Sequence, residues 1–168
     1  MTYLNLRRNK MTNIVLARID DRLVHGQVMT SWLNYLKANV IVVVDDATAN
    51  NPMLEIVLKS VVPHNIQFYL FTKEQAVVEL AKSKKDERII LLVKYPQTLE
   101  YLINNGINIS EINIGGMAIN SERETVYKWL AASKDEKTSI QRMINQGIDV
   151  SIQIVAEDRK LDARDYFK

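Results

Sequence analysis

Residues 18–27 read Arg-Ile-Asp-Asp-Arg-Leu-Val-His-Gly-Gln and follow an apolar run that begins at Asn13. The apolar run is typical of a β-strand, and the amphipathic segment from Val28 to Leu36 is typical of a helix. The charged residues between them therefore form a loop at the point where a strand ends and a helix begins. In α/β proteins such loops lie at the carboxyl edge of the sheet, where ligands bind.

The loop ends in His25, which is the candidate nucleophile. A neutral imidazole can attack an electrophile, and Arg22, three positions earlier, is placed to hold the anion that is attacked. Gly26 allows close backbone approach, and the free amides of Gly26, Gln27 and Val28 at the start of the helix attract anions. These groups suit a site that accepts a phosphoryl unit and passes it on. The alternative is that His25 is an ordinary solvated surface residue. The charged residues and the glycine next to His25 make this alternative less favoured.

Arg18 and Asp20 are expected to maintain the shape of this loop. Asp20 is predicted to cap backbone amides or to pair with Arg18 or Arg22. Ordinary surface ion pairing, which contributes little to stability, is the alternative for these residues.

Two further loops follow predicted strands and are candidate walls of the same site. Asp45 and Asp46 end the β-branched run 40–44, where two carboxylates can serve as acid and base or hold magnesium. We favour a solvated loop in which one carboxylate accepts hydrogen bonds from nearby amides or arginines. Gly115 and Gly116 end another strand, where they either let the backbone approach the imidazole or simply permit a tight turn.

Alternating strands and helices predict a three-layer α/β fold: a mostly parallel, twisted sheet of about seven strands, with helices on both faces and the active histidine in the first βα loop. The predicted strands are 13–19, 40–44, 67–71, 88–93, 111–114, 126–131 and 148–155, and the predicted helices are 27–37, a helix opening at 51–52, 72–81, one ending near 104, and 135–145. The last strand is assigned to the edge of the sheet. The charged tail 157–168 is expected to dock through its aromatic pair, Tyr166 and Phe167, against the body of the domain or against another subunit.

Individual side chains are also assigned a place from helical spacing. Trp32 is predicted to be buried, although with Met29 it could reach the edge of a partner surface around His25. Met53, Ile56, Val57 and Ser60 are predicted to form the inner face of their helix. His64, without charged or glycine neighbours arranged around it, is interpreted as a surface or capping residue.

The composition indicates a globular protein with one domain. The chain has 168 residues, 47% hydrophobic and 25% charged, with a formal charge of +2 and no cysteine. A domain of about this length buries close to 70% of its unfolded surface, so residues 13–168 are predicted to fold as a single unit. Residues 1–12 lack the apolar core of a secretory signal and are predicted to be a flexible or added extension.

The same features exclude several classes of function. Thiolate zinc sites need cysteine, and the only two histidines lie far apart in sequence, so no metal site is predicted. The charge is too small and too dispersed to indicate a nucleic-acid partner. No apolar run is long enough for a membrane span.

The segment 13–28, with Trp32 after it, closely resembles the opening of the IIB subunits of the mannose/fructose/sorbose family of the bacterial phosphoenolpyruvate:sugar phosphotransferase system. The resemblance extends to 40–46, 113–117 and 147–155 and so covers nearly the whole chain from Met11. It is highly specific at the histidine loop and looser elsewhere.

The resemblance implies a cytoplasmic phosphocarrier, peripherally associated with a membrane permease and without a cofactor. A phosphohistidine of the IIA protein would donate to Nδ1 of His25, which would then pass the group to a sugar entering through the membrane subunits IIC and IID. Relatives handle hexoses, sorbose and amino sugars, and many self-associate, so a homodimer is compatible with the resemblance. Two other readings stay open: a regulatory domain that only binds an anion or small ligand, and a hydrolase that uses His25 with Asp45 or Asp46.

Overall fold

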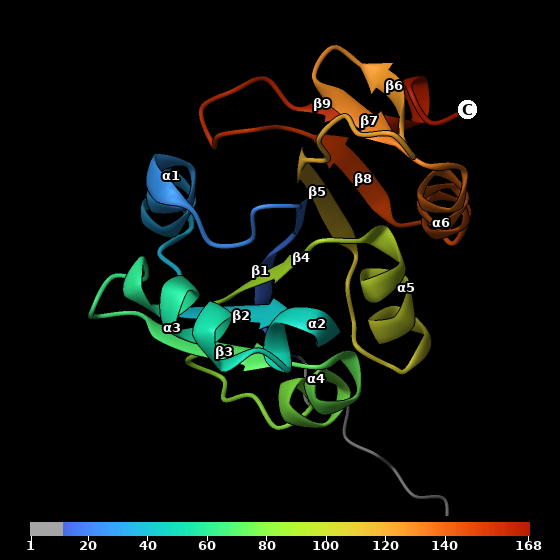
Figure 1. The fold of residues 1–168 in the computed structure, drawn as a ribbon. Helices are drawn as coiled ribbons and strands as arrows, with labels where there is room; N and C mark the ends of the chain where they lie inside the picture. The colour runs from blue at the N-terminus through green and yellow to red at the C-terminus, as the bar shows by residue number, and fades with distance from the viewer. Residues whose placement is uncertain (1–11) are drawn as a thin grey trace, which may run out of the picture.

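The computed structural model describes residues 12–168, which form one α/β unit (Figure 1). The main sheet has seven strands in the order β3-β2-β4-β1-β5-β8-β9, and only the β8–β9 pair is antiparallel. Its strands are β1 (Ile14–Asp20), β2 (Val40–Val44), β3 (Gln67–Phe71), β4 (Ile89–Val93), β5 (Glu111–Gly116), β8 (Asp149–Ile152) and β9 (Leu161–Asp162). The predicted fold class is therefore confirmed.

Helices cover both faces of this sheet, as Figure 1 shows. They are α1 (Gly26–Leu36), α2 (Asp46–Ala49), α3 (Pro52–Ser60), α4 (Lys73–Leu80), α5 (Pro96–Asn104) and α6 (Lys134–Asn145), with a short 3-10 turn at Ala163–Asp165. Successive residues of a strand point to opposite faces, so β2 and β4 supply alternate side chains to two separate cores. One core lies against α1, and the other lies against α4, α5 and α6.

The β4 strand lies inside the sheet between β2 and β1, as its continuous apolar sequence predicts. Each of its five residues is almost fully buried. Trp32 is also buried, as predicted, and its indole nitrogen donates to the carbonyl oxygen of Ile154. A capping box formed by Thr72 and Gln75 begins α4, at the start of the predicted helix 72–81.

Three local predictions are wrong. The segment predicted as one strand at 126–131 is an antiparallel hairpin of β6 (Glu124–Tyr127) and β7 (Leu130–Ala132), because Lys128 adopts a left-handed turn conformation. The β8 strand is not an edge strand, since β9 from the tail pairs with it. The proposed inner face of α3 is exposed: that helix has no buried residue.

The tail docks on the body of the domain, as predicted. Besides pairing through β9, it buries Phe167 in the core, and the Tyr166 ring lies 4.7 Å from the ring of Tyr127. Nearly all of the predicted extension 1–12 lies outside the described residues. Within the described part, no helix combines the length and apolarity that a bilayer crossing requires.

Candidate functional site

The loop between β1 and α1 is held in one conformation by its backbone. The amide of Asp21 donates to the carbonyl oxygen of Gly116 at 2.9 Å, and the amide of Leu23 donates to that of Asp20 at 2.9 Å. Leu23 has a φ of 56°, an uncommon value for a residue with a branched side chain. The Leu23 and Val24 side chains are buried against α1, which offsets this strain and anchors the residues before His25.

A buried carboxylate, that of Asp20, lies at the centre of the loop. It accepts hydrogen bonds from the Arg18 guanidinium (3.0 Å), from the Arg22 backbone amide (3.1 Å) and from Arg22 Nε (3.3 Å). Its Oδ2 also lies 3.1 Å from Nε2 of His25. Burial alone would raise the pKa of Asp20, but the hydrogen bond with His25 and the charge of Arg18 outweigh it and hold this pKa at about 2.

This contact fixes how the His25 ring is oriented. An ionised carboxylate can only accept hydrogen bonds, so in the neutral imidazole Nε2 carries the hydrogen and Nδ1 has the free lone pair. Nδ1 makes no hydrogen bond within residues 12–168. The side chain is 19% exposed, so the ring is partly covered yet reachable from solvent.

Arg18 holds Asp20 in place and occupies the space next to Gly115, where a side chain would otherwise lie. Its guanidinium is fully buried, donates to Oδ1 of Asn113 at 2.6 Å and to the carbonyl oxygen of Gln153 at 3.0 Å, and lies against the Trp32 ring. A Cβ atom on Gly115 would lie only 1.8 Å from Arg18 Cζ.

Gly116 also leaves no room for a side chain, because a Cβ atom there would lie 2.8 Å from Oδ1 of Asp20. The two glycines therefore leave room for the Arg18 guanidinium and for the Asp20 carboxylate, and the connection from them to the imidazole runs through that carboxylate.

Arg22 and the start of α1 surround the exposed part of the site. The Arg22 side chain is 57% exposed and uses Nε on Asp20, while its two terminal nitrogens make no hydrogen bond within the described chain. His25 is the N-cap residue of α1 but its side chain does not cap the helix, so the amides of Gly26 and Gln27 have no side-chain acceptor there. The Gln27 side chain lies outside the described residues.

A second ion-pair network holds the loop from the side of β5 and α6. Arg123 donates to both carboxylate oxygens of Asp21, at 2.6 and 3.1 Å, and to both oxygens of Glu136 in the first turn of α6. The amide of Ala118 adds a 2.7 Å bond to Asp21. Burial alone would lower the pKa of Arg123, but its bonds to Glu136 and Asp21 raise that pKa above its ordinary value.

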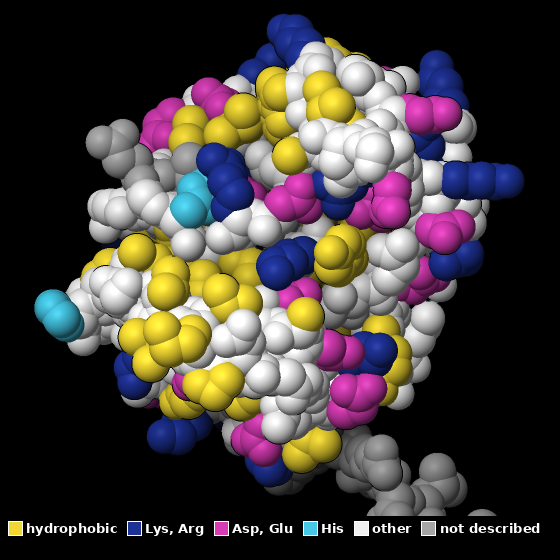
Figure 2. Space-filling model, viewed as in Figure 1, with side chains coloured by type: hydrophobic (Ala, Val, Ile, Leu, Met, Phe, Trp, Pro, Cys, Tyr) yellow, Lys and Arg dark blue, Asp and Glu magenta, His cyan; other side chains and the backbone are white. Residues whose placement is uncertain are grey.

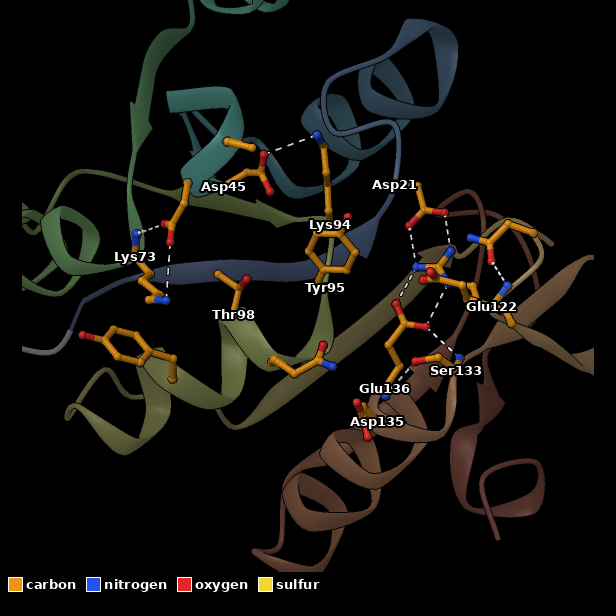
Figure 3. A pocket seen from close by; sticks show the side chains of 16 residues that line it. Asp21, Asp45, Lys73, Lys94, Tyr95, Thr98, Glu122, Ser133, Asp135 and Glu136 are labelled. Atoms are coloured by element: carbon orange, nitrogen blue, oxygen red, sulfur yellow. Dashed lines mark hydrogen bonds and ion pairs between the residues drawn. The ribbon is translucent and has the colours of Figure 1, made fainter. Parts of the chain in front are cut away.

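A polar cleft of about 880 Å³ opens beside this network (Figure 3). Its walls include Asp21 and Glu136 on one side and the Asp45–Lys94 ion pair (3.3 Å) on the other. Asp45 accepts from the amide of Thr48, as expected of that carboxylate, but the expected solvated loop is wrong, because Asp45 is buried and caps α2. His25 is not among the residues that line the cleft, and Asp45 makes no bond to it.

Sequence analysis identified the residues of the loop itself. It missed Arg123, which holds the loop through Asp21, and Lys94, which pairs with Asp45 in the wall of the cleft. Lys94 directly follows β4, just as Asp45 directly follows β2. Polar residues at the carboxyl ends of parallel strands are candidate site residues, so the sequence could have indicated Lys94 as well. Arg123 gave no local signal, because its partner Asp21 is 102 residues away in the chain. His64 is exposed, in agreement with its interpretation as a surface or capping residue.

The fold and the loop together define an α/β domain with a reachable imidazole at the end of its first strand. The family model described as "PTS system sorbose subfamily IIB component" matches residues 14–168, and the chain belongs to this family. It is therefore a IIB-type component of the phosphotransferase system, with a role in sugar phosphotransfer.

Individual relatives agree with this assignment. The chain is 31% identical over 149 residues to the N-acetylgalactosamine-specific IIB component 1 of Escherichia coli, covering 88% of this chain and 94% of that protein. It is 30% identical over 157 residues to the fructose-specific component of Bacillus subtilis, covering 90% and 94%. The crystal structure of the IIB domain of the Klebsiella pneumoniae sorbose permease superposes with a TM-score of 0.86 at 27% identity, covering 92% of this chain and 95% of that chain.

Substitution of Gly115 by alanine tests the packing behind Asp20. The added Cβ overlaps the fully buried Arg18 guanidinium and forces it to shift, so Gly115→Ala is expected to lower the free energy of unfolding by about 1–3 kcal/mol. Urea denaturation measures the change, and Ser110→Ala, at an exposed position just before β5, is the control. Equal stability of the two variants would contradict this account of the glycine.

The lowered pKa of Asp20 predicts a pH dependence of stability. Because its pKa in the folded state, about 2, is below the usual unfolded value of about 3.9, Asp20 stabilises the fold above pH 4, and this contribution is lost as the pH falls towards 2. Between pH 5 and pH 3 the loss from this residue is about 1 kcal/mol. Asp20→Asn should flatten the fall by that amount in urea titrations at the two pH values, and an unchanged pH slope would count against the assigned pKa.

Proposed function

We propose that this chain is the IIB phosphocarrier of a bacterial sugar phosphotransferase system. In this proposal His25 accepts a phosphoryl group from a phosphohistidine of IIA and passes it to a sugar that enters through IIC and IID. The observation that carries the proposal is the contact between Asp20 and Nε2 of His25, which leaves Nδ1 as the free nucleophile.

The names of the relatives support the substrate class and the partners. They are specific for N-acetylgalactosamine, fructose and sorbose, and the mannose-specific relative of E. coli is an EIIAB component, of which this chain matches 47%. A IIB-like unit is thus joined to a IIA unit in that relative. The phosphoryl donor of this chain is accordingly a IIA protein and the final acceptor a sugar, and the chain works in the cytoplasm against the membrane subunits.

The transfer step follows from the atoms at the site. The Nδ1 lone pair attacks the phosphorus atom, the new N–P bond forms, and the bond from phosphorus to the donor imidazole breaks, so the donor nitrogen leaves with the electron pair. The His25 ring becomes more positive as the bond forms, because Nε2 keeps its hydrogen. The ionised Asp20 beside Nε2 stabilises this charge.

The oxygens of the transferred group need donors, since phosphoryl transfer depends mainly on positioning and on stabilising the charge of those oxygens. Arg22 can offer its two terminal nitrogens while Nε stays on Asp20. The uncapped first turn of α1 offers backbone amides and the positive end of the helix dipole. Both lie next to the imidazole in the chain and need no large rearrangement.

Phosphorylation by purified components tests the proposal, with the second histidine as a matched control. Incubation with phosphoenolpyruvate, the general phosphotransferase proteins and the cognate IIA should add one acid-labile phosphoryl group, seen by intact mass. His64→Ala should retain the whole signal because His64 is exposed and apart from the loop, whereas His25→Ala should lose it. If the unmodified chain gains no phosphate, it behaves as a purely ligand-binding domain and the proposal is wrong. A His25→Ala variant that still gains phosphate would also falsify the proposal.

A further inference from the structure

The α3 helix presents an apolar stripe to solvent. Met53, Ile56, Val57 and Val61 recur at the spacing of one helix face, and their exposed fractions are 68%, 62%, 57% and 52%. We call these four residues the α3 stripe. Apolar residues at this spacing normally face a core, and contiguous exposed apolar surface on a folded domain marks an interaction site. The apolar spacing that led to the wrong prediction of a buried face therefore indicates a surface that another protein covers.

The α3 stripe lies beside the histidine loop. The inner residues Leu58 and Val62 pack on the same core cluster as Leu23 and Val24, the two residues that precede His25. Figure 2 shows apolar side chains gathered over α3, next to the surface formed by the loop between β1 and α1. The helix and the loop thus form one continuous face of the molecule.

A protein that exchanges phosphate with His25 must cover this face. The donor nitrogen and phosphorus have to approach Nδ1 to roughly 3–3.5 Å, so the two protein surfaces meet around the loop. A standard interface occupies about 800 Å² per partner, a patch with a radius of about 16 Å. A helix is about 10 Å across, which is less than the radius of this patch. Because α3 packs on the same core cluster as the loop, it falls within a patch centred on His25.

The charge of the helix selects between the two kinds of partner. Glu55 and Lys59, the charged residues of α3, are exposed and opposite in sign, so the helix has no net charge. Cytoplasmic loops of membrane subunits carry an excess of Lys and Arg and would match an acidic surface. An apolar centre with a polar rim is instead the pattern of an interface between two soluble proteins.

We propose that the α3 stripe is the docking surface for the soluble phosphoryl donor, the IIA protein. This inference rests on the proposed function and adds the surface through which the donor is recognised. The stripe lowers the Michaelis constant for phospho-IIA by burying apolar side chains of both partners. It does not touch the transferred group, so the rate at saturating donor is set by the loop alone.

The test compares two valines of matched exposure, Val57 on α3 and Val78 on α4, which is 53% exposed. Transfer from purified phospho-IIA to the chain is followed by rapid quench at a range of donor concentrations. Val57→Glu should raise KM about tenfold or more with kcat within twofold, and Ile56→Glu should act in the same direction. Val78→Glu should leave both constants within twofold. Because all three positions are exposed, the variants are expected to keep the thermal midpoint of the unmodified chain.

Three outcomes would overturn the inference. An unchanged KM in Val57→Glu would show that α3 is not part of the donor interface. A normal donor step with slowed transfer from phosphorylated chain to sugar, in vesicles that contain IIC and IID, would assign the stripe to the membrane subunits. Loss of a dimer in Val57→Glu with normal KM would assign it to a second copy. If the unmodified chain accepts no phosphate at any donor concentration, the proposed function fails rather than this surface.

Discussion

The structure around the candidate site depends on one buried carboxylate. Asp20 is the last residue of β1, is fully buried, and is surrounded by hydrogen-bond donors from Arg18, Arg22 and His25. A buried charge is costly unless it is paired and hydrogen-bonded, and these donors together keep the carboxylate ionised. In return the ionised carboxylate holds the imidazole in one orientation and one tautomer. The chemistry of His25 is in this way set by a residue five positions before it.

The loop that carries His25 is fixed from two sides. Arg18 anchors Asp20 to β5 and to the segment after β8, and Arg123 anchors Asp21 to the first turn of α6. Rigid strands and a helix thus determine the position of a short loop. In the proposed function two partners act on this site in turn, and such support lets each of them meet the same geometry without a cost of ordering. The exposed groups, Arg22 and the start of α1, are the ones that a phosphate would meet.

The sequence alone predicted most of the fold and the inner part of the site. Apolar runs such as 40–44 and 89–93 identify buried parallel strands because both faces of the sheet are covered, and the charged loop after 14–20 is local in the chain. The long-range clamp at Arg123 could not be predicted, since its partners come from separate elements. The α3 stripe was misassigned because periodicity shows that a helix has an apolar face and does not show which surface covers it.

The measurement that most directly tests the role of Asp20 is nitrogen-15 NMR of the His25 ring, before and after phosphorylation by the donor. At a pH where the ring is neutral, the account predicts hydrogen on Nε2 before transfer. After transfer it predicts phosphorus coupled to Nδ1, with Nε2 still protonated. Phosphorus on Nε2, the nitrogen that faces Asp20, would contradict it.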